Sequence, residues 1–406
     1  MSTSLTEVNK FDNIVKSKET QFIDNDEKFI TKLSMYIYSS SSDSDSDSDY
    51  DIDTKAEPIT LPYPGKWGAM GMAFPVPKEM EKVQTLTDKQ NRAFWVRNQI
   101  SLADDVKNWN TICYKKPINK MEIDVNKRAK NLFSKILYFF AQADKIVMDN
   151  IQCNFQEEIK WIWFQNYYAA QEGIEAIHSQ AYQMMVHAFM PNSKDREVAA
   201  KAITESKSIT KKKKWIKKYM NKKTKSLAAR MAAFVFIEGG FFSSSFAYID
   251  KARAYRTLVG FCEYNDLISK DESLHTLAGI AFYRYYLVNH LKTTDLVKMA
   301  TEAAEIELEF NKECLPLPLP GLSAADMAKY IKFTFHRLLV GLDPKAEKLS
   351  PYRFVTHKLK IAEESNLRKQ SNFFEVDSHE YSAPITSKTT SSNKSVFISF
   401  LESDEL

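Results

Sequence analysis

Long segments of this chain carry apolar residues at intervals of three and four positions, which is the spacing of one face of an α-helix. The clearest of these segments span residues 130–153, 161–190, 226–249 and 266–290, and Gly and Pro are nearly absent from them. Gly accounts for only 10 of the 406 residues, which argues against a turn-rich β protein. The pattern therefore predicts an all-α protein.

The segment from Met231 to Ile249 is apolar enough to raise the question of a membrane span. It contains a single charged residue, Glu238, near its middle, and an acidic side chain at the centre of a bilayer is costly. A helix that is apolar on every side is also typical of the core of a large soluble bundle. We therefore expect a buried core helix and no membrane association.

The two ends of the chain differ in composition from its helical middle. Residues 1–58 include an Asp/Ser alternation that cannot bury apolar surface, so we expect a disordered, acidic and Ser-rich N-terminal extension. Residues 59–366 carry the helical pattern and are predicted to form one domain. Residues 367–406 are rich in Ser and Thr before an apolar and acidic end, and we expect a flexible C-terminal tail.

Charge and cysteine content narrow the class of protein further. The 56 basic and 52 acidic residues nearly balance, and we expect no nucleic-acid partner. A Lys-rich stretch at 211–225 contains Trp215 and Tyr219, and we interpret it as a solvated helix surface beside a loop. The four cysteines are scattered without C-x-x-C spacing, and the first 30 residues lack a secretory pattern. Both observations favour a cytoplasmic location.

Two predicted helices each contain a Glu-x-x-His motif, Glu175 with His178 and Glu272 with His275. A spacing of three residues places both side chains of a pair on one face of the helix, so each pair can hold one metal ion. An apolar helix with a lone acid precedes each motif. Before the first motif this acid is Asp144, which lies 31 residues before Glu175. Such an interval suits an antiparallel helix hairpin, and the chain therefore resembles two similar halves.

The second lone acid is Glu238, 34 residues before Glu272. Four carboxylates and two imidazoles form the recurring ligand set of a dinuclear carboxylate site in a four-helix bundle. Four carboxylates neutralise two divalent ions, whereas four buried carboxylates without metal would repel one another. Oxygen-rich ligation with two imidazoles favours iron or manganese over structural zinc.

Tyr182 follows His178 by four residues, which places it close to the ligand face of its helix. Three apolar residues lie one or two turns from Glu238 or Glu272, on the ligand sides of the other helices: Phe242, Phe246 and Ile268. We expect Tyr182 to be buried among them. A buried tyrosine normally has a hydrogen-bond partner, and the Asp144 carboxylate is the candidate.

Five segments resemble the small, radical-bearing subunit of class I ribonucleotide reductase. They are FFAQAD (139–144), EAIHSQAY (175–182), FIEGGFFSSSF (236–246), SKDESLH (269–275) and SNFFEVDSHEY (371–381). The resemblance implies a ferritin-like helical bundle, two iron ions that react with oxygen, and a stable tyrosyl radical on Tyr182. The ligands that it implies are Asp144, Glu175, His178, Glu238, Glu272 and His275.

The resemblance also implies a route for the radical out of the bundle. Trp95 matches the family's tryptophan, Asp271 the acid that links it to His178, and Tyr381 the tail tyrosine that relays the radical to the large subunit. The implied function is the small subunit of ribonucleoside-diphosphate reductase, which helps convert ribonucleotides to deoxyribonucleotides. We expect a homodimer whose last eleven residues, 396–406, dock on the large subunit.

Three segments depart from the family's pattern. Residues 98–101 read Asn-Gln-Ile-Ser where the family usually has an acidic run, Lys270 replaces an arginine, and Ser350 begins Ser-Pro-Tyr-Arg-Phe. None of them includes a predicted ligand or Tyr182.

Two other functions fit part of the pattern. A di-iron carboxylate oxidase would use the same ligands but needs neither Tyr182 nor a tail with Tyr381. A non-catalytic iron-binding bundle would need no pairing of Trp95 with Asp271. Both iron and manganese fit the ligand set.

Overall fold

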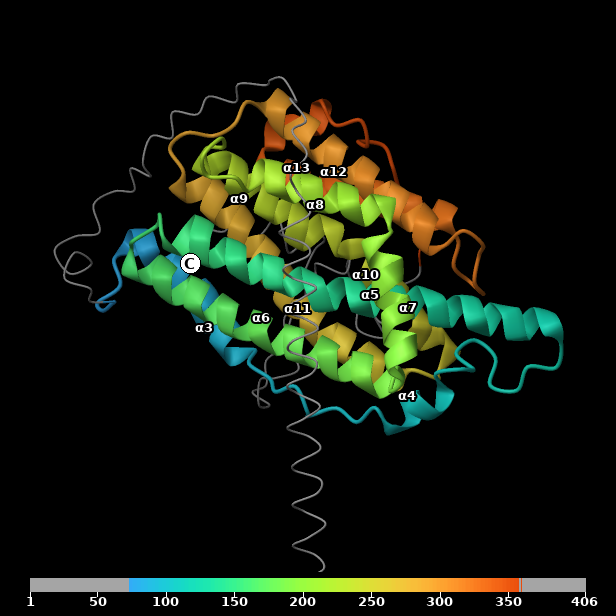
Figure 1. Ribbon diagram of the computed structural model, residues 1–406. Helices are drawn as coiled ribbons and strands as arrows, with labels where there is room; N and C mark the ends of the chain where they lie inside the picture. Colours follow the sequence, from blue (N-terminus) through green and yellow to red (C-terminus); the bar gives the residue numbers. More distant parts are fainter. Residues whose placement is uncertain (1–72, 358, 360–406) are drawn as a thin grey trace, which may run out of the picture. The chain divides into compact units, whose positions relative to one another are not determined.

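The protein is described by a computed structural model, and the described residues are 73–357 and 359 (Figure 1). Within these residues the regular secondary structure is helical, and one isolated bridge between Leu319 and Leu322 is the sole β feature. The all-α prediction is therefore confirmed. The predicted extension at 1–58 and the predicted tail at 367–406, with Tyr381, lie outside the described residues.

Two long helix hairpins form the centre of the described domain. In the first, α5 (Lys120–Asn150) packs along α6 (Ile162–Phe189) (Figure 1). In the second, the continuous helical run α9 (Leu227–Phe236), η3 (Ile237–Phe241) and α10 (Ser243–Ala252) packs on α11 (Val259–Tyr286). These helices are the ones that the apolar spacing predicted, but α5 begins ten residues earlier and α11 seven residues earlier than predicted, and the other ends differ by at most four residues.

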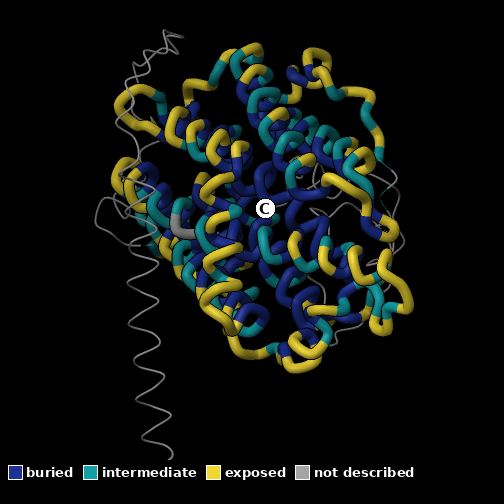
Figure 2. The backbone as a smooth tube through the Cα atoms, turned by 45° about the vertical axis from the view of Figure 1, so that its right-hand side comes forward, coloured by how far each residue is buried: buried dark blue, intermediate teal, exposed yellow. Residues whose placement is uncertain are grey.

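The remaining helices surround these hairpins. Their bounds are η1 (Lys78–Met80), α3 (Glu81–Arg92), α4 (Ala103–Asn108), η2 (Ile151–Gln156), α7 (Ser193–Thr204), α8 (Lys207–Tyr219), η4 (Arg253–Tyr255), α12 (Thr293–Cys314), α13 (Ala324–Leu342) and η5 (Pro344–Lys348). Helix α3 packs on α6, and α12 packs on both α8 and α13. Buried positions line the interior that the helices enclose, and exposed positions face outward (Figure 2).

Four of the described α-helices start at a residue whose side chain caps a free backbone N–H group. The Asn119 side chain accepts a hydrogen bond from the Glu122 backbone N–H at the start of α5, and Ser226 does the same for Ala229 at the start of α9. Ser206 and Ser323 cap α8 and α13 in the same way. Local sequence therefore fixes where these helices begin, and packing fixes how they are arranged.

The apolar helical run at the centre is part of the core. Among the described helices, Leu227–Tyr255 is long and apolar enough to cross a membrane, and its most apolar window is entirely buried in the protein. The prediction of a buried core helix is confirmed.

Within that run, η3 is a turn of π-helix that includes Glu238. Its two glycines allow α13 to approach closely, because a Cβ on Gly239 would lie 2.7 Å from Leu338 Cδ2 and a Cβ on Gly240 would lie 2.6 Å from Phe335 Cζ. Single π-helical turns inside α-helices are frequent at functional sites.

The Lys-rich stretch forms most of α8 and the loop after it, as expected, but only part of the helix surface is solvated. Lys211 is exposed and pairs with Glu309 of α12 at 2.7 Å, as expected for a solvated face. Lys212, however, is only 2% exposed, and Trp215 and Tyr219 are also buried. The prediction of a solvated surface is thus wrong for this side of α8, because the helix is amphipathic and packs on α12.

Candidate metal centre

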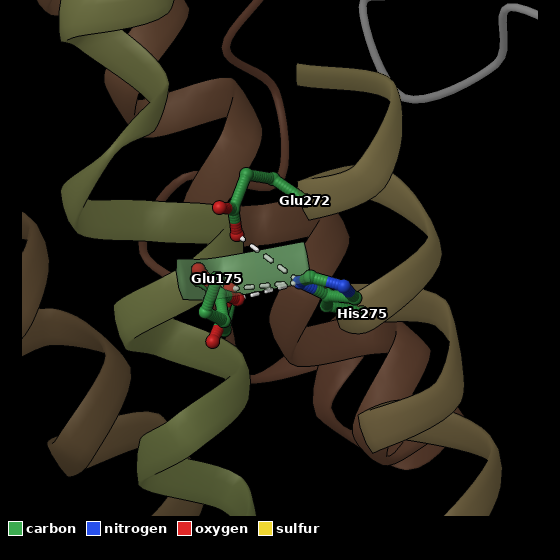
Figure 3. A group of neighbouring side chains, drawn as sticks. Glu175, Glu272 and His275 are labelled. Carbon is green, nitrogen blue, oxygen red and sulfur yellow. Dashed lines mark ion pairs between the residues drawn. The ribbon is translucent and has the colours of Figure 1, made fainter. Parts of the chain in front are cut away.

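The two Glu-x-x-His motifs meet inside the bundle, where α6 and α11 face the π-helical turn η3. One ligand atom from each of four buried residues lies within 4.8 Å of all the others: Glu175, Glu238, Glu272 and His275. Figure 3 shows the carboxylates of Glu175 and Glu272 beside the imidazole of His275. Three helical elements that are far apart in sequence therefore contribute to one cluster.

His178 completes the described part of the cluster. Its Nδ1 lies 3.1 Å from Glu175 Oε2 and 3.2 Å from Glu272 Oε1, and the side chain is fully buried. Asp144 belongs to α5, but its side chain lies outside the described part of the structure. The structure thus brings together five of the six predicted ligands.

Like His178, His275 faces the carboxylates of the cluster with its ring nitrogen Nδ1. Its Nδ1 lies 2.9 Å from Glu175 Oε1, 3.6 Å from Glu272 Oε2 and 3.7 Å from Glu238 Oε2. Neutral imidazoles bind metal ions through one nitrogen while the other makes a hydrogen bond that fixes the ring. Both histidines have a partner for that second nitrogen.

For His275 the partner is Gln90, whose Oε1 lies 3.0 Å from Nε2. Gln90 is 2% exposed and belongs to α3, which is distant from α11 in the sequence. Gln90 was not among the site residues predicted from the sequence. The only signal for it was a polar side chain on the apolar face of an amphipathic helix.

For His178 the partner is Asp271, whose Oδ2 lies 3.0 Å from Nε2. The same oxygen accepts a hydrogen bond from the indole Nε1 of Trp95 at 2.8 Å. The Trp95 ring also stacks on His178, with 5.9 Å between the ring centroids and 23° between the planes. Trp95, Asp271 and His178 therefore form a continuous buried path from the α3–α4 connection to the cluster.

Trp95 has a second aromatic neighbour in Tyr264 of α11, at 6.1 Å between ring centroids. The Tyr264 hydroxyl donates to the backbone carbonyls of Arg97 and Ile100, the latter at 3.1 Å. The segment at 98–101 that departs from the family pattern is thus tied to the bundle through Tyr264 rather than through acidic side chains.

The donor atoms of the cluster fit bound metal ions. Both carboxylate oxygens of Glu238 are buried, and neither makes a hydrogen bond of acceptable geometry within the described residues. The same holds for Glu175 Oε1, Glu272 Oε2 and His275 Nδ1. Buried carboxylates without partners are costly, and divalent ions among these atoms would satisfy all of them at once.

The electrostatics of the cluster support the same conclusion. Burial and the negative charges of Glu272 and Glu175 hold the pKa of Glu238 well above its usual value. Burial alone would also raise the pKa of Glu272, but its polar interactions with Glu238, His178 and His275 outweigh burial and leave that pKa lowered. The same carboxylates raise the pKa values of His178 and His275, so without metal the negative charge is offset by protons on the carboxylates and imidazoles, a role that metal ions would take over.

Tyr182 is 1% exposed and lies in an aromatic environment. Its ring stacks on Phe140 of α5, at 4.7 Å between centroids and 9° between planes. Phe140 in turn contacts Phe246 at 4.8 Å and Phe242 at 5.6 Å. Tyr182 is buried as expected, but the ring that stacks on it belongs to Phe140, which is part of the FFAQAD segment and was not predicted to lie here; Phe242 and Phe246 lie against Phe140.

Comparison with known proteins identifies the family. The sequence model of the family described as "Ribonucleotide reductase, small chain" matches residues 75–347, which is more than half of the chain. Ribonucleoside-diphosphate reductase small chain 1 of Saccharomyces cerevisiae is 31% identical over 306 residues, covering 75% of this chain and 72% of the relative. The ribonucleoside-diphosphate reductase small chain of Nicotiana tabacum is 29% identical over 328 residues, covering 80% and 91%.

Solved structures show the same ferritin-like fold. A ribonucleotide reductase homodimer from Saccharomyces cerevisiae superposes with a TM-score of 0.61 at 21% identity, covering 73% of this chain and 90% of the other. A dimanganese(II) protein of Streptococcus sanguinis, NrdF, superposes with a TM-score of 0.53 at 16% identity, covering 64% and 88%.

These relationships favour the reductase over the oxidase and the iron-binding bundle as the function of the chain. Together with the carboxylate and histidine cluster, they support a dinuclear metal cofactor. The chain belongs to the ribonucleotide reductase small-chain family, whose members are oxidoreductase subunits.

Proposed function

We propose that this chain generates a tyrosyl radical on Tyr182 and holds it for ribonucleotide reduction by a large subunit. The observation that carries the proposal is the buried cluster of Glu175, Glu238, Glu272 and His275, in which four carboxylate oxygens make no hydrogen bond within the described residues. The proposed ligands are these four with His178 and Asp144. The proposed metal is iron, because the five sequence segments resemble those of a radical-bearing di-iron subunit. The structurally similar NrdF protein holds manganese instead.

The bound metal ions would supply the capacity to reduce dioxygen and so to oxidise a neighbouring side chain. Tyr182 would give up one electron and its phenolic proton. Its burial against Phe140 would exclude water and external reductants from the ring, which favours a long-lived radical. Gln90 and Asp271 would hold the two imidazoles in the orientation that binding requires.

Trp95 and Asp271 would connect the cluster with the large subunit. When Trp95 gives an electron inward, its indole N–H becomes acidic, and the Asp271 oxygen that already accepts this N–H at 2.8 Å can take the proton. Tyr381 is the proposed next carrier, on the tail outside the described residues. The buried indole of Trp95 is thereby linked to the metal centre through Asp271 and His178.

The proposed assembly is a cytoplasmic homodimer bound to a large subunit, supported by the homodimeric yeast relative. Residues 396–406 combine apolar and acidic side chains and are the proposed docking peptide. Removing them should leave metal content and the Tyr182 radical unchanged and abolish association with the large subunit. Equal affinity of the full-length and truncated chains for the large subunit would show that docking lies elsewhere.

Metal analysis tests the proposed ligands. After loading with Fe(II) and oxygen, elemental analysis should give about two irons per chain, and His275→Ala should lower this number. His290→Ala is the matched control, because His290 bonds the Tyr283 carbonyl and lies outside the cluster. The proposal fails if His275→Ala binds as much iron as the unmodified chain.

A further inference from the structure

Lys212 is buried beside the π-helical turn η3, although it belongs to the Lys-rich helix α8. Its Nζ donates a hydrogen bond to the backbone carbonyl of Phe241, the last residue of η3, at 3.0 Å. The same Nζ lies 2.6 Å from Glu307 Oε2 of α12, and both side chains are almost completely buried. One ammonium group thus joins two outer helices to the turn that contains Glu238.

The polar contacts continue into the start of α10. The Ser244 hydroxyl donates to Glu307 Oε1, and the Ser243 hydroxyl donates to the carbonyl of Gly240 at 2.7 Å. Two consecutive carbonyls of η3, those of Gly240 and Phe241, therefore accept hydrogen bonds from side chains. This is the point at which π-helical hydrogen bonding returns to the α-helical pattern, where the backbone ladder is interrupted.

The buried pair is unlike an ordinary surface ion pair. The Lys212 ammonium lies 3.8 Å from the ring centroid of Phe310 and 4.3 Å from that of Phe139, so it is enclosed by aromatic rings. Burial lowers the pKa of Lys212 and raises that of Glu307, and each charge partly offsets the shift of the other. Apolar replacements of such buried pairs are often neutral for stability, so stability alone does not account for it.

Packing around η3 differs between its two sides. On the side of α13, Gly239 and Gly240 leave no room for a Cβ. On the side of α8, a small apolar cavity of about 30 Å³ is bordered by Lys212, Ile237 and Phe242. Close contacts with α13 therefore fix the turn on one side. On the side of α8, the hydrogen bond from Lys212 adds to the ring contact between Trp215 and Phe241, at 5.2 Å between centroids.

We propose that Lys212, Glu307 and Ser244, here called the Lys212 clamp, position Glu238 for metal binding by fixing the π-helical turn. This inference rests on the proposed function in taking Glu238 as a ligand. The clamp residues are positioning residues, because Lys212 contacts the backbone of η3 and none of the clamp residues is in the metal cluster.

The decisive variant removes both charges of the clamp while keeping its volume, Lys212→Met with Glu307→Leu. The single change Lys212→Met would leave Glu307 buried without a cation, which can cost stability by itself. The matched control is Lys211→Met with Glu309→Leu, which removes the neighbouring exposed pair between the same two helices. Thermal unfolding of all chains separates effects on folding from effects on the site.

Anaerobic titration with Fe(II) against a chelator is the main measurement. The clamp variant should unfold close to the temperature of the unmodified chain and bind Fe(II) about tenfold or more weakly, whereas the control variant should match the unmodified chain. Hydrogen exchange of metal-free protein should be faster in residues 237–242 of the clamp variant alone.

The two proposals fail in different ways. If the unmodified chain bound no more than one metal ion, this result would contradict the proposed function. Hydrogen exchange at residues 237–242 would still test the Lys212 clamp. A clamp variant with unchanged Fe(II) affinity and unchanged exchange at 237–242 would overturn the inference and leave the proposed function intact.

Discussion

Trp95 and Asp271 are hydrogen bonded across 176 positions of the sequence, from the indole Nε1 to the carboxylate Oδ2 at 2.8 Å. The same oxygen lies 3.0 Å from the imidazole Nε2 of His178. A single carboxylate thus contacts both an oxidisable ring and a side chain of the cluster. This arrangement has no use in a metal store, but it suits a protein that moves an electron and a proton together.

The first prediction concerns Trp95. Trp95→Phe should retain the metal ions and the Tyr182 radical, because Trp95 lies outside the cluster. Nucleotide reduction with the large subunit should fall about 100-fold or more, since phenylalanine has no N–H for Asp271 and is hard to oxidise. Trp109→Phe is the control, because Trp109 is an equally buried indole that stacks on Phe189. Near-normal turnover in Trp95→Phe would indicate another route.

The second prediction concerns Gln90. Gln90→Leu should lower metal affinity roughly 10- to 100-fold, because His275 would lose the hydrogen bond that fixes its ring. Competition with a chelator measures the effect. Gln84→Leu on the same helix is the control, because Gln84 bonds Asp88 instead of a cluster residue. If both variants held metal equally well, Gln90 would have only a packing role.

The third prediction concerns pH and Asp250. Burial raises the pKa of Asp250 to about 6 from its ordinary value of 3.8, although Arg253 opposes the shift. Between these values the folded chain binds more protons than the unfolded chain, so this group makes folding less favourable as pH rises from about 4 to 6.

Asp250→Asn removes this titration and should stabilise the fold at pH 7 by about 1–3 kcal/mol, with a much smaller effect near pH 4. Unfolding in denaturant at both pH values measures the difference. Asp104→Asn is the control, because Asp104 is exposed and forms a surface ion pair with Lys107. A gain of stability that is the same at both pH values would exclude Asp250 titration as the cause.

Apolar periodicity was enough to predict the four central helices because each of them buries a continuous stripe. It could not predict the π-helical turn at Ile237–Phe241. That segment is apolar on every side, so a change in helical phase leaves the pattern unaltered. The partners that contact this turn, α13 and Lys212, are separate from it in the sequence.

The candidate site also contains residues that the sequence predicted and residues that it did not. Glu-x-x-His is a local signal, since both side chains lie on one helical turn, and five of the six proposed ligands come together. Gln90, Phe140 and Lys212 carry no local signal that is specific to a metal site, because each acquires its position when separate helices pack. A glutamine, a phenylalanine or a lysine on an amphipathic helix has no feature that distinguishes a supporting residue from an ordinary one.

The most direct test of the proposed radical site is a low-temperature electron paramagnetic resonance spectrum after loading with Fe(II) and oxygen. The unmodified chain should show a tyrosyl signal together with about two irons per chain. Tyr182→Phe should keep the iron and lose the signal, while Tyr248→Phe, which removes another buried hydroxyl, should keep both. An undiminished tyrosyl signal in Tyr182→Phe, or none in the unmodified chain at full iron content, would contradict the assignment.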